Sequence, residues 1–425
     1  MLRRLAVPLL LVLGALAVMT ASAARGGAQE TPGPPEVEEL PLDEAPASVE
    51  EIPPSEATVP PEGVPPETVP PETVPPEEAP LAPGWQAEVA VDANLIALKW
   101  AGDGGAEFAV EALAQDRSWR HAGDIGLHDN GPDPGTPEGD AAVVRNVSEP
   151  LWTGDVSVVR VTLTAGTATE VTLVAIDSPP VGDVPSVPAQ QAGALANGLL
   201  AAGIAGVIAA LVPGRRRLLA LGVLAAILAV ACAPVKQGAP GMPSIVSRHA
   251  WGHDLPWNAG GQQCGQSAPT IASGVGFAVV HHTVNSNAYS SDQSVQIVRG
   301  IWAYHTGTNG WCDIGYNFLI DRYGQIFEGR MGGWDKAVVG AHAAGFNTGS
   351  TGVAFIGDHQ VTPVPGAAQA SIVDLIAWKF NVHHTDPTPW NAIVGHRDVN
   401  QTACPGNAAY SLLPGFRSAV QARVS

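Results

Sequence analysis

The stretch GHRDVNQTACPG, from Gly395 to Gly406, carries a histidine and a cysteine in one short loop. His396 and Cys404 could hold a metal ion, because imidazole nitrogen and thiolate sulfur are ligands that zinc prefers. They could instead act as a base and its nucleophile, or Cys404 could be one half of a disulfide. Each of these chemistries needs further partners, which the rest of the chain must supply.

A second candidate for such chemistry lies in VVHHTV, residues 279–284, where His281 and His282 stand at the end of an expected strand. A side chain at a strand end can point into a cleft. Because side chains alternate in direction along a strand, only one of the two adjacent histidines should face a metal. Periodicity does not choose between them, and a histidine pair could also be a surface or packing feature.

The elements that must position these residues belong to a C-terminal region, residues 242–425, in which strand and helix patterns alternate. Ser291 and Asp292 are expected to cap a helix, and Pro414 is expected to break the last one. Further expected elements are strands at 274–282 and 351–357, a hairpin at 316–329 and a helix at 370–380. The pattern predicts an α/β fold with a mixed central β-sheet flanked by helices.

An earlier region, residues 84–180, has a different pattern. Runs of alternating β-branched residues such as DVSVVRVTLTAG, residues 155–166, are separated by turn-rich stretches such as HDNGPDPGTPEGD, residues 128–140. Period-two alternation between Gly, Pro, Asn and Asp clusters predicts a small all-β domain resembling a sandwich. The region carries no catalytic constellation, so we interpret it as an accessory spacer or binding module.

The chain has 425 residues, enough for two or three domains, and a formal net charge of −19. Much of this charge lies in residues 25–83, where the tetrapeptide VPPE repeats and no Lys or Arg occurs from Glu30 to Glu78. Proline removes backbone donors and the carboxylates repel one another, so this segment is predicted to be an extended, disordered stalk. The acidity argues against nucleic acid as a partner.

The N-terminus, residues 1–24, has the pattern of a secretory signal peptide. Arg3 and Arg4 precede a short apolar run, and Ala21-Ser22-Ala23 matches the small-residue cleavage signature. An uncleaved membrane anchor is the alternative interpretation. In either case the following residues leave the cytoplasm and enter a compartment where disulfides persist.

A second membrane region is expected at residues 192–233. Two apolar runs, 192–212 and 218–233, flank the sequence PGRRR, which predicts a hairpin with its tip in the cytoplasm. Alternatively, the second run could be a lipoprotein-like signal that ends at Cys232. Both interpretations place the C-terminal region outside the cytoplasm, either anchored to the membrane or secreted.

Several motifs of the C-terminal region occur together in one order. They are SRHAWG at 247–252, VVHHTV at 279–284, GWCDIGYNFLIDRYGQIFEGR at 310–330, GAHAAGFNTGSTGVAFIG at 340–357 and the opening GHRDVNQTACPG. The region resembles the zinc-dependent N-acetylmuramoyl-L-alanine amidases of type 2 and the peptidoglycan recognition proteins. The β region before it is similar to an accessory domain that precedes such amidases in actinobacteria.

The resemblance implies roles for individual residues. It makes His281, His396 and Cys404 the ligands of Zn²⁺. It gives Tyr316 the part of a hydroxyl that assists the attacking water and the oxyanion, and Thr402 a place beside it. A glutamate that some relatives carry is replaced by alanine here, at Ala354, which makes Tyr316 more important.

The resemblance also places further residues around the expected cleft. Candidates for contacts with glycan or stem peptide are His305, Arg330, His342 and Asn347. With Cys404 assigned to zinc and Cys232 beside the membrane, Cys264 and Cys312 remain and could pair in an oxidising compartment. Two reduced thiols are the alternative.

The function that the resemblance implies is hydrolysis of the amide bond between N-acetylmuramic acid and L-alanine in peptidoglycan. A protein that binds peptidoglycan without cutting it is the alternative, but such proteins typically lack the zinc cysteine, whereas this chain has Cys404. The expected partners are peptidoglycan and the membrane, and the sequence carries no signal of oligomeric state.

Overall fold

The computed structural model describes residues 33–42, 80–114, 116–127, 130–142, 146–181, 241–258 and 264–424. The predicted signal peptide at 1–24 and the predicted membrane region at 192–233 lie outside these residues, as does Cys232. Among the described residues, no helix has both the length and the apolar character needed to cross a bilayer.

The C-terminal part is built on a six-stranded sheet with the order β13-β9-β12-β10-β11-β8. Its strands are β8 (Ile245–Val246), β9 (Phe277–His282), β10 (Phe318–Ile320), β11 (Ile326–Glu328), β12 (Ser350–Phe355) and β13 (Ile393–Gly395). The hairpin strands β10 and β11 are antiparallel, and the other neighbours are parallel. The mixed central sheet that the sequence predicts is therefore present.

Helices cover both faces of this sheet, because its strands are apolar on both sides. Phe318 and Ile320 of β10 pack toward α7 (Gly366–His383) and α9 (Leu413–Val424), whereas Leu319 packs toward α6 (Ser294–Ala303) on the opposite face. Shorter elements complete this part. They are α5 (Arg248–Gly252), η3 (Tyr304–Thr308), η4 (Trp390–Ala392), η5 (His396–Asp398) and α8 (Asn407–Tyr410).

Two helix boundaries differ from those expected. Helix α6 begins at Ser294 after Gln293, which makes no side-chain capping bond, so Ser291 and Asp292 do not cap it. Pro414 does not break the final helix either, because it is the second residue of α9. Proline is tolerated in the first turn, where its missing N–H would have no partner within the helix.

The N-terminal part is a single antiparallel sheet with the order β1-β7-β2-β6-β3-β4, in which β5 also pairs with β2. Its strands are β1 (Glu36–Pro41), β2 (Gln86–Gly102), β3 (Glu107–Leu113), β4 (Trp119–Gly126), β5 (Asn146–Val147), β6 (Leu151–Ala165) and β7 (Ala168–Asp177). The strands enclose one apolar core that contains Phe108, Val161 and Leu173. The short helix α2 (Pro137–Ala141) lies between β4 and β5.

Strand β1 falls inside the segment predicted to be an extended stalk. It pairs with β7 at the edge of the sheet, where its glutamates remain in contact with solvent. Lys99 forms an ion pair with Glu39 across this edge, and Leu42 is buried just beyond the strand. Acidic composition therefore did not prevent pairing, because an edge strand needs backbone partners and few buried side chains.

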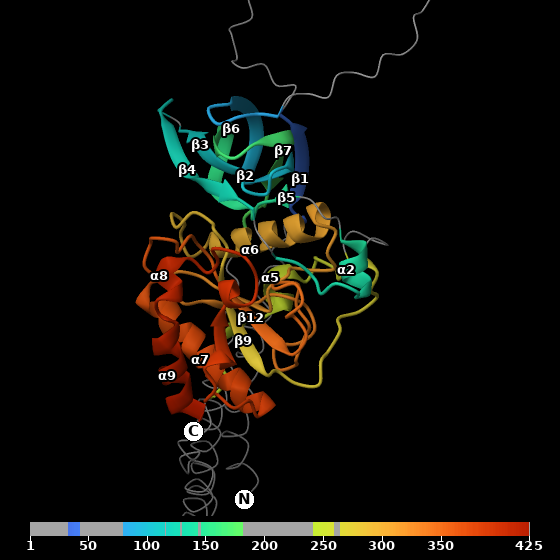
Figure 1. Ribbon diagram of the computed structural model, residues 1–425, viewed down its shortest axis with the longest axis vertical. Coiled ribbons are helices and arrows are strands. Elements are labelled where there is room, and N and C mark those ends of the chain that lie inside the picture. Colours follow the sequence, from blue (N-terminus) through green and yellow to red (C-terminus); the bar gives the residue numbers. More distant parts are fainter. Residues whose placement is uncertain are drawn as a thin grey trace, which may run out of the picture.

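The two sheets are joined by a shared apolar core, and the N-terminal sheet lies over helix α6 (Figure 1). Leu95 and Trp152 of the N-terminal sheet pack in one cluster with Ile297 and Ile301 of α6. Gly300 makes this approach possible, because a Cβ atom there would lie 2.4 Å from Cδ1 of Leu95. The contact fixes how the N-terminal sheet sits on the C-terminal part.

This close approach predicts that Gly300→Leu destabilises the protein. A larger side chain would overpack the shared core, which typically costs about 1–3 kcal/mol. The matched control is Gly366→Leu at the start of α7, where an added Cβ meets nothing within 4 Å. Thermal unfolding of full-length protein should show a lower midpoint for the first variant alone, and equal midpoints would contradict the packing described.

Candidate metal centre

Two parallel strands bring the first two candidate ligands together. Strand β13 pairs with β9 so that Gly395 lies opposite Val280. The residues that follow these two are His396 and His281, so both imidazoles emerge at the carboxyl edge of the sheet. Their ring centroids are 4.5 Å apart. The carboxyl edge of parallel strands is the usual position for a ligand in sheets of this kind.

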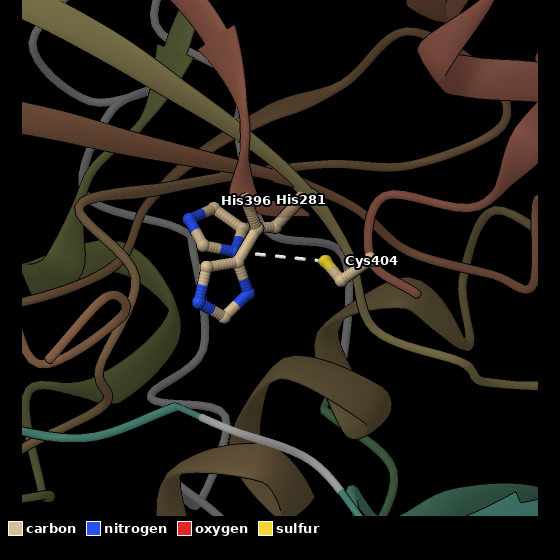
Figure 2. Close-up of side chains that lie close together, drawn as sticks. All are labelled: His281, His396 and Cys404. Atoms are coloured by element: carbon tan, nitrogen blue, oxygen red, sulfur yellow. Dashed lines mark hydrogen bonds between the residues drawn. The ribbon is translucent and has the colours of Figure 1, made fainter. Parts of the chain in front are cut away.

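Cys404 completes the group from the loop that follows η5. The N–H of Arg397 donates to the carbonyl of Cys404 at 2.9 Å and closes this loop. The Sγ atom lies 3.7 Å from Nδ1 of His281. One ligand atom from each of His281, His396 and Cys404 lies within 4.8 Å of the others, and the three side chains converge (Figure 2).

This donor set fits a metal ion. Two imidazole nitrogens and one sulfur are ligands typical of zinc sites, and three protein ligands leave a fourth position open. Burial raises the pKa of the Cys404 thiol well above its ordinary value, so the thiol stays protonated without a cation nearby. Metal binding would therefore release a proton from this sulfur.

The structure separates the two adjacent histidines, as strand alternation requires. His281 lies in the triad, whereas His282 faces the segment that follows β12. Its Nδ1 accepts from the backbone N–H of His359 at 3.1 Å and lies 3.5 Å from a carboxylate oxygen of Asp358. His282 is therefore a packing residue in this structure, although it is buried like its neighbour.

Tyr316 is completely buried beside the triad, with its ring centroid 5.4 Å from that of His281. Its hydroxyl oxygen accepts a hydrogen bond from Nδ2 of Asn130 at 2.7 Å. Burial, with Glu149 nearby, raises the pKa of Tyr316 well above its ordinary value. The hydroxyl therefore keeps its proton and can act as a donor.

His305 lies in the single π-helical turn η3 and contacts the same region. The N–H of Gly315 donates to its Nδ1 at 3.1 Å, so a neutral ring carries its proton on Nε2. That nitrogen lies 3.4 Å from Oε1 of Glu149. Because π-helical turns are frequent at functional sites, the position of His305 agrees with a functional role.

His342 and Asn347 lie behind the triad. Nδ1 of His342 is 3.1 Å from Nε2 of His281, so it can fix the orientation of that ring. Burial lowers the pKa of His342 to about 3, which keeps its ring neutral near pH 7. Asn347 accepts from the N–H groups of His342 and Ala343 at 2.7 and 3.0 Å and thereby holds the loop that carries His342.

Arg330 and Thr402 occupy different surroundings. The guanidinium of Arg330 is buried, forms an ion pair with Glu138 and lies over the ring of Trp257. The Oγ1 atom of Thr402 accepts from the N–H of Cys404 at 3.2 Å. Thr402 thus supports the loop of the third candidate ligand.

The predicted pairing of Cys264 with Cys312 is confirmed by a disulfide in the structure. Of the three cysteines in the described residues, Cys404 stays outside this bond and is buried. Two cysteines of the described C-terminal part thus form a disulfide, and the third is a candidate metal ligand.

Sequence reasoning missed the polar residues that the N-terminal part contributes to this site. They are Asn130, Asp133, Glu138 and Glu149. The first three lie in HDNGPDPGTPEGD, which has the composition of an ordinary turn. Four acidic residues and an asparagine in one stretch were the available signal, but the partners of Asn130, Asp133 and Glu138 lie far away in the sequence.

The C-terminal part is similar in sequence to known proteins. The sequence profile described as N-acetylmuramoyl-L-alanine amidase matches residues 272–407. Peptidoglycan-recognition protein SC2 of Drosophila simulans is 33% identical over 163 residues, which cover 38% of this chain and 80% of that protein. Peptidoglycan recognition protein 1 of Bos indicus is 33% identical over 171 residues, with 40% and 82% covered.

Among solved structures, wild-type Drosophila PGRP-LB is 30% identical and matches 39% of this chain and 90% of its own, with a TM-score of 0.34. The identity to the two recognition proteins, over four fifths of their length, decides the assignment. The chain belongs to the family of type 2 amidases and peptidoglycan recognition proteins.

Proposed function

We propose that the C-terminal part hydrolyses the amide bond between N-acetylmuramic acid and L-alanine in peptidoglycan. The observation that carries this proposal is the triad of His281, His396 and Cys404 with the hydroxyl-bearing Tyr316 beside it. The match to an amidase profile and the likeness to proteins named for peptidoglycan support the same substrate class.

The triad would hold Zn²⁺, which when bound supplies Lewis-acid polarisation of a carbonyl and a water nucleophile active near pH 7. In the hydrolysis, a water oxygen adds to the amide carbonyl carbon, the C–N bond breaks, and the leaving amine takes a proton. Tyr316 would donate its O–H to the oxygen on which negative charge develops. His342 would hold the ring of His281 in place through the 3.1 Å contact.

Binding of peptidoglycan without cleavage is the second candidate function. One observation supports it, namely that the two relatives described above are named recognition proteins. A pure binding protein, however, has no need of a buried thiol that converges with two imidazoles on one point.

We further propose that the C-terminal part acts outside the cytoplasm and is tethered by the apolar region at 192–233. The disulfide between Cys264 and Cys312 supports an oxidising compartment. The signal-like N-terminus at 1–24 supports export. Zn²⁺, peptidoglycan and a membrane would then be the partners of the chain.

The metal assignment predicts different outcomes for the two adjacent histidines. His281→Ala removes a ligand, so bound zinc should fall from about one ion per chain to near zero. His282→Ala is the matched control, because this side chain faces His359 and Asp358 instead of the triad. Elemental analysis of the purified variants measures the difference. The assignment fails if His281→Ala retains its zinc while His282→Ala loses it.

The hydrolase proposal is tested by digesting purified cell-wall sacculi with full-length protein and identifying released stem peptides by mass spectrometry. Tyr316→Phe removes a hydroxyl, so turnover should drop by about 100-fold or more, as for loss of an oxyanion donor. Zinc content and affinity for muramyl peptide should not change. Full activity of Tyr316→Phe would exclude the assigned role. If the wild type and the double variant Asp133→Asn/Glu138→Gln both bind sacculi but release nothing, recognition alone is favoured.

A further inference from the structure

The candidate site has no open side in this structure. The side chains of His281, His396, Tyr316 and His305 are 0% exposed, and Cys404 is 2% exposed. Hydrolysis of a polymer requires a cleft that the substrate can enter. The segment that covers the site therefore determines whether the protein can act in this conformation.

Part of the cover comes from the N-terminal part, between β4 and β5, and Glu149, which follows β5, lies beside His305 as well. We call residues 130–142, which include α2, the plug. Figure 1 shows α2 lying against the C-terminal part and away from the sheet to which it is connected. Nδ2 of Asn130 donates both to the hydroxyl oxygen of Tyr316, at 2.7 Å, and to Oε1 of Glu149, at 2.8 Å. The plug thus forms a hydrogen bond with the Tyr316 hydroxyl, which the proposed reaction would use.

A carboxylate fixes the middle of the plug to the loop behind the triad. Oδ1 of Asp133 accepts from the N–H of Gly345 at 2.9 Å and from the N–H and Nδ2 of Asn347 at 3.0 and 2.7 Å. Oδ2 accepts from the N–H and hydroxyl of Thr348 at 3.1 and 2.9 Å. The carbonyl of Gly131 accepts a further bond from Asn347 at 2.8 Å.

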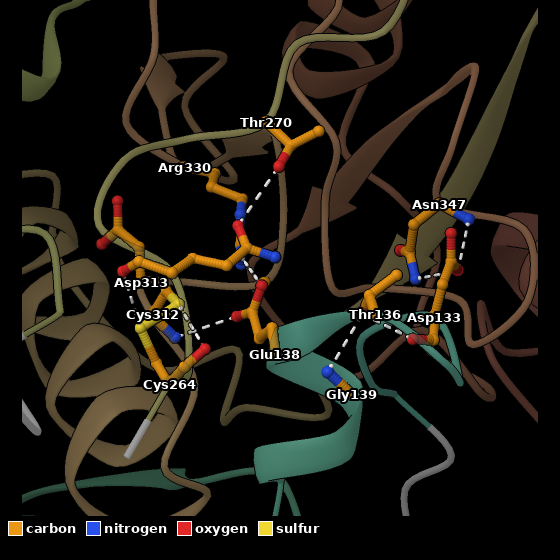
Figure 3. A network of polar contacts seen from close by, with 12 residues as sticks. Asp133, Thr136, Glu138, Gly139, Cys264, Thr270, Cys312, Asp313, Arg330 and Asn347 are labelled. Carbon is orange, nitrogen blue, oxygen red and sulfur yellow. Dashed lines mark hydrogen bonds and ion pairs between the residues drawn. A yellow bond between two sulfur atoms is a disulfide. The ribbon is translucent and has the colours of Figure 1, made fainter. Parts of the chain in front are cut away.

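A second carboxylate fixes the end of the plug. Thr136 caps helix α2 by accepting from the N–H of Gly139 at 3.0 Å, and this turn directs Glu138 into the C-terminal part. Glu138 is buried, forms an ion pair with Arg330 and accepts from the N–H of Cys312 at 2.9 Å (Figure 3). A candidate for substrate contact, Arg330, is therefore already occupied by a carboxylate of the same chain.

The contacts of the plug differ in kind from those that join the two sheets. The N-terminal sheet is fixed through an apolar core that includes Leu95 and Trp152. The plug is instead fixed mainly through carboxylates, and a cavity of about 160 Å³ remains between it and the C-terminal part, beside Gln266 and Gly340. Polar contacts can be exchanged for water or for another ligand, so the plug could leave while the sheet stays in place.

We propose that the plug, residues 130–142, is an autoinhibitory segment that occupies the substrate cleft and must leave before peptidoglycan can reach the triad. This inference rests on the proposed function of the cleft. The carboxylates of Asp133 and Glu138, which hold the plug, bind backbone N–H and guanidinium groups of the C-terminal part. Such groups bind carboxylates in general. A substrate that carries carboxylates, as stem peptides do, would compete with Asp133 and Glu138 for these groups.

The first test loosens the plug and measures access to Cys404 without relying on catalysis. Asp133→Asn combined with Glu138→Gln weakens both anchors, and Asp140→Asn is the control because this exposed carboxylate lies in the same helix. All proteins carry Cys232→Ser and are zinc-free and full-length. Alkylation of Cys404 should be about tenfold faster or more in the double variant, because each lost bond involves a charged group.

The outcome of this test is decisive in both directions. Faster alkylation in the double variant alone, with an unchanged thermal midpoint, supports the plug. Equal rates in the double variant, Asp140→Asn and the wild type would overturn it. If access to Cys404 increases but the same variants, once loaded with zinc, release no stem peptides from sacculi, the plug covers the site as proposed and the proposed hydrolysis fails.

The second test locks the plug in place. A Cβ atom added to Gly131 would lie 3.9 Å from Cβ of Ala344, within the span of a disulfide. Oxidised Gly131→Cys/Ala344→Cys should therefore release no stem peptides and should regain activity after reduction. Wild-type protein treated with the same reductant controls for the native disulfide. A locked protein as active as the wild type would contradict autoinhibition.

Discussion

The candidate metal centre depends on the hydrogen bonds that align β13 in parallel with β9. Both strands end at the same edge of the sheet, so His281 and His396 follow paired residues and meet without any long-range adjustment. The loop that follows η5 then places a single side chain, that of Cys404, beside His281. Strand β12 lies on the other side of β9 with Ala354 opposite His281, which leaves the small space at this edge to the triad and Tyr316.

The N-terminal part is attached to this site by two unlike sets of contacts. Apolar packing of Leu95 and Trp152 against α6 fixes the sheet, whereas carboxylates hold the segment that reaches the cleft. Burial of apolar area is nondirectional and is lost only when the surfaces separate. Hydrogen bonds and ion pairs can be replaced one at a time by water or by a ligand. Because of this difference, the N-terminal sheet can stay packed on α6 while the carboxylate contacts of residues 130–142 are exchanged.

The strands and helices of the C-terminal part could largely be predicted from local patterns of the sequence. The choice of His281 over His282 could not, because periodicity left it open, and the candidate triad came from the resemblance carried by the ordered motifs. The hydrogen bond between Asn130 and Tyr316 joins residues 186 positions apart, and the pair of Glu138 with Arg330 spans 192. No local pattern marks such partners, so the acidic residues of the turn-rich stretch at 128–140 did not reveal which groups they contact. Strand β1 was missed for a similar reason, since its pairing depends on the distant strand β7.

X-ray absorption spectroscopy at the zinc edge of full-length protein tests the central claim most directly, because it identifies the atoms around the metal independently of activity. The account predicts one sulfur at about 2.3 Å and two imidazole nitrogens at about 2.0–2.1 Å, from Cys404, His281 and His396. The sulfur contribution should disappear in Cys404→Ser. A zinc environment made of oxygen and nitrogen alone in the wild-type protein would contradict the account.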